Sequence, residues 1–113
     1  MYEDVKAQLH GRPRKKIANN TYLELDVMDS DKINMYLHGN RIASFTKNHI
    51  TLSHAGWYTR TTKDRLNLAL ELANMLNVIY QHKWQWYISG IYKQHEQKFY
   101  GGIQLRYDRT IRG

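Results

Sequence analysis

Lys and Arg are the commonest charged side chains in this sequence, and the majority of them fall into three clusters. The clusters contain Arg12, Arg14, Lys15 and Lys16; Arg60, Lys63 and Arg65; and Arg106, Arg109 and Arg112. Guanidinium and ammonium groups bind phosphate through charge-assisted hydrogen bonds. The chain carries 17 Lys and Arg against 10 Asp and Glu, a formal net charge of +7. This excess predicts a polyanionic partner, and the three clusters are therefore the candidate nucleic-acid-binding residues.

The first cluster lies in the segment HGRPRKK, residues 10–16. This segment resembles the core of an AT-hook, in which an extended Gly-Arg-Pro backbone lies in the minor groove of A·T-rich DNA. His10 stands where that motif has an arginine. The alternative is a solvated basic linker, and the sequence does not decide between the two.

The second cluster surrounds the expected start of a helix. Cations near a helix N-terminus oppose the helix dipole, so structure alone would not select Arg60, Lys63 and Arg65 there. Together with the free N–H groups of that terminus, these cations predict a phosphate site.

Two histidines and their neighbours are the candidates for catalysis. His38, His49 and Arg41, with Tyr36, would share one sheet face if the strands have the register that we expect. General acid–base chemistry by such a set could cleave RNA without a metal. The alternative is a polar, aromatic strand surface, and we expect the chain not to be an enzyme.

Metal and cofactor sites are not expected. The sequence has no cysteine, and its six histidines form no His-x-His or His-x-x-x-His pair. No acidic residue lies near His49 or His54 to orient a ligand, as metal-bound histidines usually require. The absence of cysteine also removes disulfides and fits a reducing compartment.

The elements that must position these residues form one α+β domain, residues 1–113. A chain of 113 residues with 42% apolar side chains has enough material for one core and too little for two. We predict a short helix plus basic linker (1–16), an antiparallel β-meander (17–60), one main α-helix (61–77) and a C-terminal β-hairpin (83–107).

The meander is predicted from alternating apolar and polar residues, which have the period of half-buried strands. Gly39-Asn40 is a signal for a two-residue hairpin turn. The side chains expected on the wet face of the sheet are Tyr22, Asn34, Tyr36, His38, His49 and Thr51.

The main helix is predicted to begin at Thr61, a good N-cap residue that has Asp64 three positions later. Before it, Trp57 is expected to plug the core under the helix. Trp84 and Trp86 would point the same way on one strand, and one of them is expected in the core. Aromatic residues interleaved with cations suit either base stacking or a protein–protein hot spot.

Three segments together resemble a family of small proteins that many tailed bacteriophages encode. They are KIANNTYL (16–23), LH (37–38) and LSHAGWYTRTTKDRLN (52–67), similar in order and spacing to an RKIANNTYL … LH … GGWxTxTTKDRIN pattern. Ala55 stands where the family more often has Gly, and Tyr100 precedes Gly101 where an acidic residue is usual. The resemblance implies a viral origin and a fold, but no particular reaction.

We therefore expect a phage accessory protein that binds nucleic acid or a nucleoprotein complex through its basic clusters. The first alternative is a host-takeover or anti-defence inhibitor that binds a host protein through an aromatic and basic surface. The second is a small, metal-independent ribonuclease. The sequence leaves open whether the chain forms a homo-oligomer.

Membrane and secretion signals are not expected. No apolar run approaches the roughly 20 residues that a membrane-spanning helix needs, and the first sixteen residues contain no apolar signal-peptide core. We expect no membrane partner and a location in the cytoplasm of the infected bacterial host.

Overall fold

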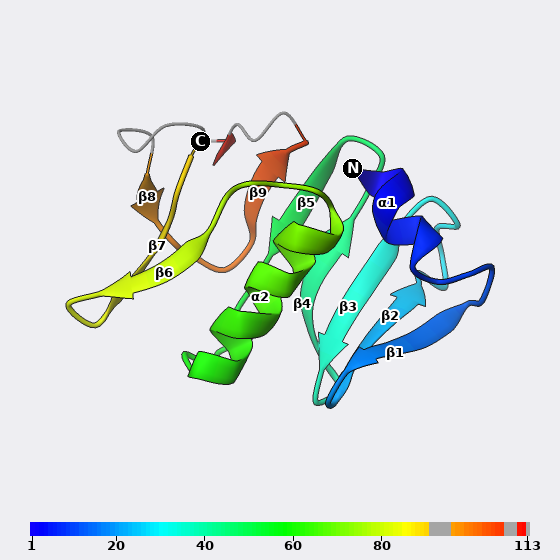
Figure 1. The fold of residues 1–113 in the computed structure, drawn as a ribbon, viewed down its shortest axis with the longest axis horizontal. Coiled ribbons are helices and arrows are strands. Elements are labelled where there is room, and N and C mark those ends of the chain that lie inside the picture. Colours follow the sequence, from blue (N-terminus) through cyan, green and yellow to red (C-terminus); the bar gives the residue numbers. More distant parts are fainter. Residues whose placement is uncertain (91–95, 108–110, 113) are drawn as a thin grey trace.

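The fold consists of a main antiparallel sheet of seven strands and a small sheet of three (Figure 1). The structure is a computed structural model, and it describes residues 1–90, 96–107 and 111–112, with only the backbone of the last two. In spatial order, the main sheet contains β1 (Arg14–Ala18), β2 (Thr21–Leu25), β3 (Ile33–Leu37), β4 (Asn40–Phe45), β5 (His49–Leu52), β9 (Ile103–Arg106) and β10 (Ile111–Arg112). The small sheet contains β6 (Ile79–His82), β7 (Gln85–Ile88) and β8 (Gln97–Lys98).

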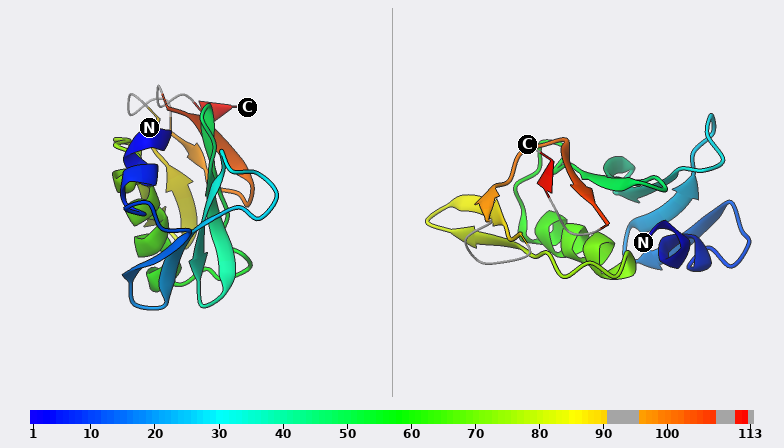
Figure 2. Two further views of the ribbon diagram at one scale, coloured as in Figure 1. Left: turned by 90° about the vertical axis from the view of Figure 1, so that its right-hand side faces the viewer. Right: turned by 90° about the horizontal axis from the view of Figure 1, so that it is seen from above.

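Both helices, α1 (Tyr2–Ala7) and α2 (Arg60–Leu72), lie on the same face of the main sheet (Figures 1 and 2). We call this the covered face and the opposite one the open face. The confirmed α+β architecture is thus a meander with one main helix, a short N-terminal helix and further strands at its C-terminal end.

The core lies between the helices and the covered face. A cross-strand row on this face, at most 2% exposed, contains Leu23, Met35, Ala43, Leu52 and Ile103. From α2, the buried residues Leu66, Ala69 and Leu70 are part of the same apolar core. Burying each leucine side chain contributes roughly 1.5–3 kcal/mol, so this packing fixes α2 on the sheet.

The open face carries a polar cross-strand row instead, because side chains alternate between the two faces of a strand. Its members are Glu24, Asn34, Ser44, Thr51 and Gln104. Asn34 is only 2% exposed. Its amide donates to Asp26 Oδ1 at 2.9 Å and its carbonyl accepts from Ser44 Oγ at 2.8 Å, so the buried polar group is satisfied.

The main helix differs from the prediction at both ends. Thr59, not Thr61, is the N-cap, because its Oγ1 accepts from the Thr62 N–H at 3.1 Å. The helix ends at Leu72 rather than at residue 77. The left-handed φ of 58° at Asn74 turns the chain away, and the Met75 N–H then closes on the Leu70 carbonyl at 2.9 Å.

Three other boundaries also differ. Part of the predicted linker is strand β1, the edge of the main sheet. The two central residues of the β3–β4 turn are His38 and Gly39, with φ angles of 51° and 79°. The turn thus begins one residue before the predicted Gly39-Asn40 turn. The predicted 83–107 hairpin is divided between sheets: β7 pairs with β6 and β8, whereas β9 pairs with β5 and β10.

Two side chains of α2 tie it to strands on either side. Asn67 donates to the Ile79 carbonyl at 2.9 Å and accepts from the Ile79 N–H at 2.8 Å, so its amide acts as a partner for the end of β6. Arg65 Nε donates to Thr21 Oγ1 at 2.8 Å, which joins the helix to the start of β2. These bonds fix α2 between the two sheets.

Replacing Asn67 by Leu should lower the free energy of unfolding by about 2–3 kcal/mol, because two buried backbone groups of Ile79 lose their partners. Urea unfolding followed by circular dichroism measures this change. As the matched control, Asn48→Ala removes an exposed amide in the β4–β5 turn and should change stability by less than about 0.5 kcal/mol. Equal effects of the two variants would contradict the role that we assign to Asn67.

Candidate nucleic-acid interface

The three sequence segments on which the phage resemblance depends meet at one end of the fold. The β1–β2 turn and the β3–β4 turn are adjacent, since the His38 N–H donates to the Asn20 carbonyl at 2.9 Å. The loop between β5 and α2 joins them through a pocket that both His38 and Trp57 line. The segments are far apart in sequence and come together only in the folded protein. This end of the fold is therefore the candidate location of a functional site.

The first cation cluster extends from this end onto the open face. Strand register puts Lys16, Tyr22, Tyr36 and Arg41 in one cross-strand row, with a cation at each end and two tyrosines between. Lys16 and Arg41 are exposed, whereas both tyrosines are half-buried. Neighbouring strands lie about 4.8 Å apart, so the row is a continuous strip with aromatic rings in the middle and a cation at each end.

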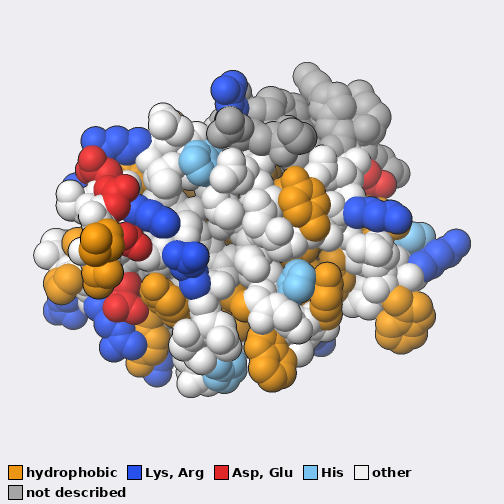
Figure 3. Space-filling model, turned by 180° about the vertical axis from the view of Figure 1, so that it is seen from behind, with side chains coloured by type: hydrophobic (Ala, Val, Ile, Leu, Met, Phe, Trp, Pro, Cys, Tyr) orange, Lys and Arg blue, Asp and Glu red, His pale blue; other side chains and the backbone are white. Residues whose placement is uncertain are grey.

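Arg14 supports this row from the side. Its guanidinium carbon lies 3.9 Å from the ring centroid of Tyr22, and its Nε lies 3.7 Å from Glu24 Oε2. The stacking and the ion pair orient the Arg14 side chain along the open face. Figure 3 shows this face, where Lys and Arg side chains gather on the side of β1 and β2 with a few acidic residues among them.

Two depressions hollow the open face around the row. The larger, about 530 Å³, is lined by Arg14, Asn20, Tyr22, Glu24, Tyr36, His38 and Gly39. The smaller, about 270 Å³, is lined by Arg41, Ile42, Ala43, Ser44, Thr51, Ser53 and Gly102. The two tyrosines and the charged groups beside them thus line hollows on the same side of the sheet.

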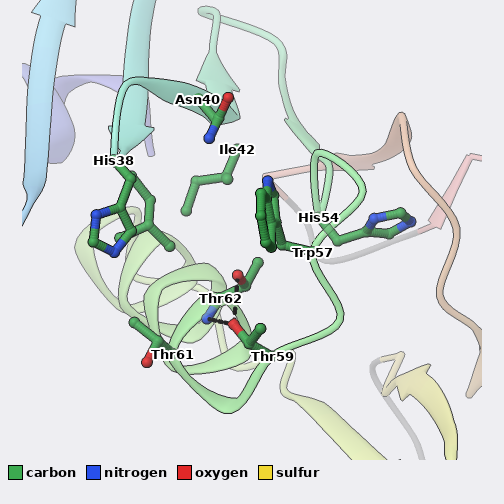
Figure 4. Close-up of a pocket in the computed structure, with 9 residues that line it drawn as sticks. His38, Asn40, Ile42, His54, Trp57, Thr59, Thr61 and Thr62 are labelled. Carbon is green, nitrogen blue, oxygen red and sulfur yellow. Dashed lines mark hydrogen bonds between the residues drawn. The ribbon is translucent and has the colours of Figure 1, made fainter.

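A third depression, which we call the end pocket, lies beside the β3–β4 turn. That turn separates it from the larger depression on the open face. It has a volume of about 490 Å³ and is lined by Leu37, His38, Asn40, Ile42, His54, Trp57, Thr59, Thr61 and Thr62. Figure 4 shows His38 and Trp57 on opposite sides of Ile42. His38 lines both this pocket and the larger open-face depression, so the two hollows share a wall.

The other two cation clusters are not assembled in the same way. Arg60 is exposed and lies 3.9 Å from Asp64, while half-buried Arg65 is bonded to Thr21. Lys63 is half-buried beside them, so Arg60 is the most accessible of this trio. In the third cluster, Arg106 is exposed at the end of β9; Arg109 and the side chain of Arg112 lie outside the described residues.

The AT-hook interpretation does not agree with the backbone of residues 10–13. His10 and Gly11 have left-handed φ angles of 51° and 78°, and the Arg12 N–H donates to the Leu9 carbonyl at 2.9 Å. The Pro13 carbonyl accepts from the Leu25 N–H at 2.8 Å. The Gly-Arg-Pro segment is therefore a turn that leads into β1, not an extended arm that could lie in a groove.

The candidate catalytic residues are also separated. His38 lies in the β3–β4 turn, beside the Arg41 end of β4, and not on the strand face that we predicted. His49 lies beyond the other end of β4, next to Thr46, where the Thr46 N–H donates to its carbonyl at 2.9 Å. Five residues of strand separate these ends by about 17 Å, so the two histidines cannot act on one bond.

The three tryptophans have different environments. Trp86 is buried at 3% exposure, whereas Trp84 is 93% exposed, so one of the pair does belong to the core. The prediction for Trp57 is wrong: it is 59% exposed and forms a wall of the end pocket. The aromatic residue that packs in its place is His54, whose ring centroid lies 4.0 Å from that of Tyr58 and 6.4 Å from that of Trp86.

The comparisons with known proteins identify the family. A family model described as the Kyanoviridae Gp96 protein matches residues 1–106. The chain belongs to this family. Kyanoviridae are tailed phages, so the viral origin that the sequence motifs implied is confirmed. A search of curated proteins and a search of solved structures gave no match.

Among residues 1–90 and 96–107, no three His, Cys, Asp or Glu side chains gather closely enough to hold a metal ion. In the part of the chain that the structure describes, no helix is long and apolar enough to cross a membrane.

His54 should make the stability of this end depend on pH. Burial lowers its pKa from the ordinary value of 6.5, and its Nδ1 accepts from the Gly56 N–H at 2.8 Å, which requires an unprotonated Nδ1. As the pH falls below about 6.5, His54 therefore becomes protonated in the unfolded chain before it does so in the folded protein. The free energy of unfolding should fall as the pH decreases from 6.5 to the lower pKa of the folded state.

Urea unfolding of the wild type and of His54→Gln between about pH 7.5 and about pH 5 measures this contribution. The variant cannot titrate, so its stability should depend less steeply on pH over that interval. The contribution of one proton is at most about 1.4 kcal/mol for each pH unit. An identical pH dependence in the two proteins would exclude His54 as the responsible group.

Proposed function

We propose that this phage protein binds single-stranded nucleic acid on the open face of the main sheet. The observation that carries the proposal is the cross-strand row of Lys16, Tyr22, Tyr36 and Arg41. Aromatic side chains on adjacent strands of a sheet can stack unpaired bases, and cations at the ends of the row can bind the phosphates between them.

Charge and shape support the same proposal. The chain has a net charge of +7, which attracts a polyanion at long range. The larger depression on the open face is about 530 Å³ and contains both tyrosines and Arg14. The unpaired bases of a single strand are free to enter such a hollow, whereas the bases of a duplex are paired and stacked in the interior of the duplex. The protein would act on this ligand in the cytoplasm of the infected bacterial host.

The salt dependence of binding tests the proposal. The affinity for a labelled single-stranded oligonucleotide, measured by fluorescence anisotropy, should fall as the salt concentration rises. A plot of the logarithm of the association constant against the logarithm of the salt concentration should have a slope of about −0.7 for each phosphate contacted. In the double variant Lys16→Ala/Arg41→Ala the slope should become shallower by about 1.4. An unchanged slope in this variant would show that the row does not contact the phosphates.

Two exposed cations outside the row provide the matched control. Lys6 lies on α1, and Lys47 lies in the β4–β5 turn, 3.6 Å from Asp31. The double variant Lys6→Ala/Lys47→Ala makes the same change in net charge and should keep most of the wild-type slope. If both double variants lose the same amount, only the net charge matters and the open face is not the site.

A specific observation also favours the second candidate function, an inhibitor of a host protein. The β6–β7 hairpin projects from the body of the molecule (Figures 1 and 2), and its two-residue turn is Lys83-Trp84. Both residues have left-handed φ angles, 48° and 69°, where Asn-Gly is the favoured pair. Because Trp84 is also 93% exposed, local structure alone would not select it. An exposed tryptophan of this kind suits a protein-binding hot spot.

Replacing Lys83 by Asn together with Trp84 by Gly tests this second candidate. The variant should be more stable by about 1 kcal/mol, because it relieves the left-handed strain at the turn. It should nevertheless lose a host protein that the wild type captures from nuclease-treated lysate in a pull-down. Capture of that protein by the variant at the wild-type level would contradict the role of Trp84.

A further inference from the structure

The end pocket has the shape of a slot with an aromatic ring on each side. His38 comes from the β3–β4 turn and Trp57 from the loop before α2, and they lie on opposite sides of Ile42 (Figure 4). Leu37 and Ile42 supply an apolar floor, and Asn40 and Thr61 supply groups that can donate or accept hydrogen bonds.

The turn that carries each ring is firmly held. On one side, His38 and Gly39 form a two-residue turn with left-handed φ angles of 51° and 79°. On the other side, Ala55 and Gly56 have φ angles of 53° and 85°. There the Trp57 N–H donates to the His54 carbonyl at 2.8 Å, and the Gly56 N–H donates to His54 Nδ1 at 2.8 Å. A ligand that enters between such preorganised groups has little ordering cost to overcome.

Packing of the core does not explain the position of Trp57. Its side chain is 59% exposed, and the aromatic contacts beneath the loop are made instead by His54 with Tyr58, Trp86 and Phe99. A large indole that contributes little to the core, on a turn with two left-handed residues, is expected where a ligand uses its ring face.

We propose that the end pocket binds one unstacked nucleobase between His38 and Trp57. This inference rests on the proposed function and makes it more specific, because His38 also lines the larger depression on the open face. A strand that crosses the row of Lys16, Tyr22, Tyr36 and Arg41 can therefore turn one base into the pocket.

The chemistry of the slot fits a base better than an aliphatic group. The pocket volume of about 490 Å³ is in the range of small-molecule sites. Its two ring-bearing walls suit a flat aromatic system, and stacking on such walls is worth about 1–3 kcal/mol per base, or roughly 5- to 150-fold in affinity. The Asn40 side-chain amide can bond to the edge of a base through both its donor and its acceptor.

Binding of two single-stranded probes of equal length tests the inference. One probe is oligodeoxythymidylate, and the other has the same backbone with every base removed. Replacing Trp57 by Ala should weaken binding of the base-bearing probe about tenfold and leave the abasic probe unaffected. Trp57→Phe, which keeps an aromatic ring, should retain most of the affinity and shows that the effect is due to stacking.

Tyr100→Ala is the control, because Tyr100 is an exposed aromatic residue that lines none of the three depressions described above. Far-ultraviolet circular dichroism and the urea midpoint confirm that each variant is folded. If Trp57→Ala binds the base-bearing probe as tightly as Tyr100→Ala does, the base pocket is excluded, while binding on the open face stands. If the wild type binds neither probe at low salt, the proposed function fails together with the pocket.

Discussion

The main sheet is covered by helices on one face only, and most other features of the protein follow from this constraint. Apolar residues must alternate with polar ones along β2 to β5, because α1 and α2 bury one face and leave the other to solvent. The polar positions are then available for a cross-strand network centred on Asn34 and for the row of cations and tyrosines. A second helical layer would have buried the cations of that row at a large desolvation cost.

Left-handed turns at the edges of this framework control where the exposed aromatic rings point. The turns at His38, Ala55 and Lys83 each contain two consecutive residues with positive φ. Small residues are usual at such positions. Here His38, Lys83 and Trp84 occupy left-handed positions themselves, and Trp57 directly follows the pair Ala55-Gly56. The ring of His38 and the ring of Trp57 thereby face the same pocket although they come from different parts of the chain.

The sequence predicts the meander well because burial in an antiparallel strand depends on local alternation. Pairing between distant segments is not local, so the addition of β9 to β5 and the separate small sheet were not predicted. The observed β3–β4 turn, His38-Gly39, begins one residue before the predicted Gly39-Asn40 turn. Gly39 belongs to both pairs and is suited to a left-handed position in each, so the sequence does not distinguish them. The cation clusters were predicted from composition, but Arg65 bonds to Thr21 only because tertiary packing brings α2 beside β2. The outward position of Trp57 depends on backbone angles that no periodicity reveals.

Strand β1 is the outermost strand at its end of the main sheet. Its outer backbone groups could accept a strand from another molecule, which is the usual route to edge-to-edge aggregation. Arg14, Lys15 and Lys16 oppose this, because a second β1 added there would bring like charges face to face. The charge that we propose attracts a nucleic acid would thus also oppose edge-to-edge contact between free copies of the protein. A bound polyanion would neutralise it, so crowding many copies on one strand would favour contacts between neighbours that do not form in its absence.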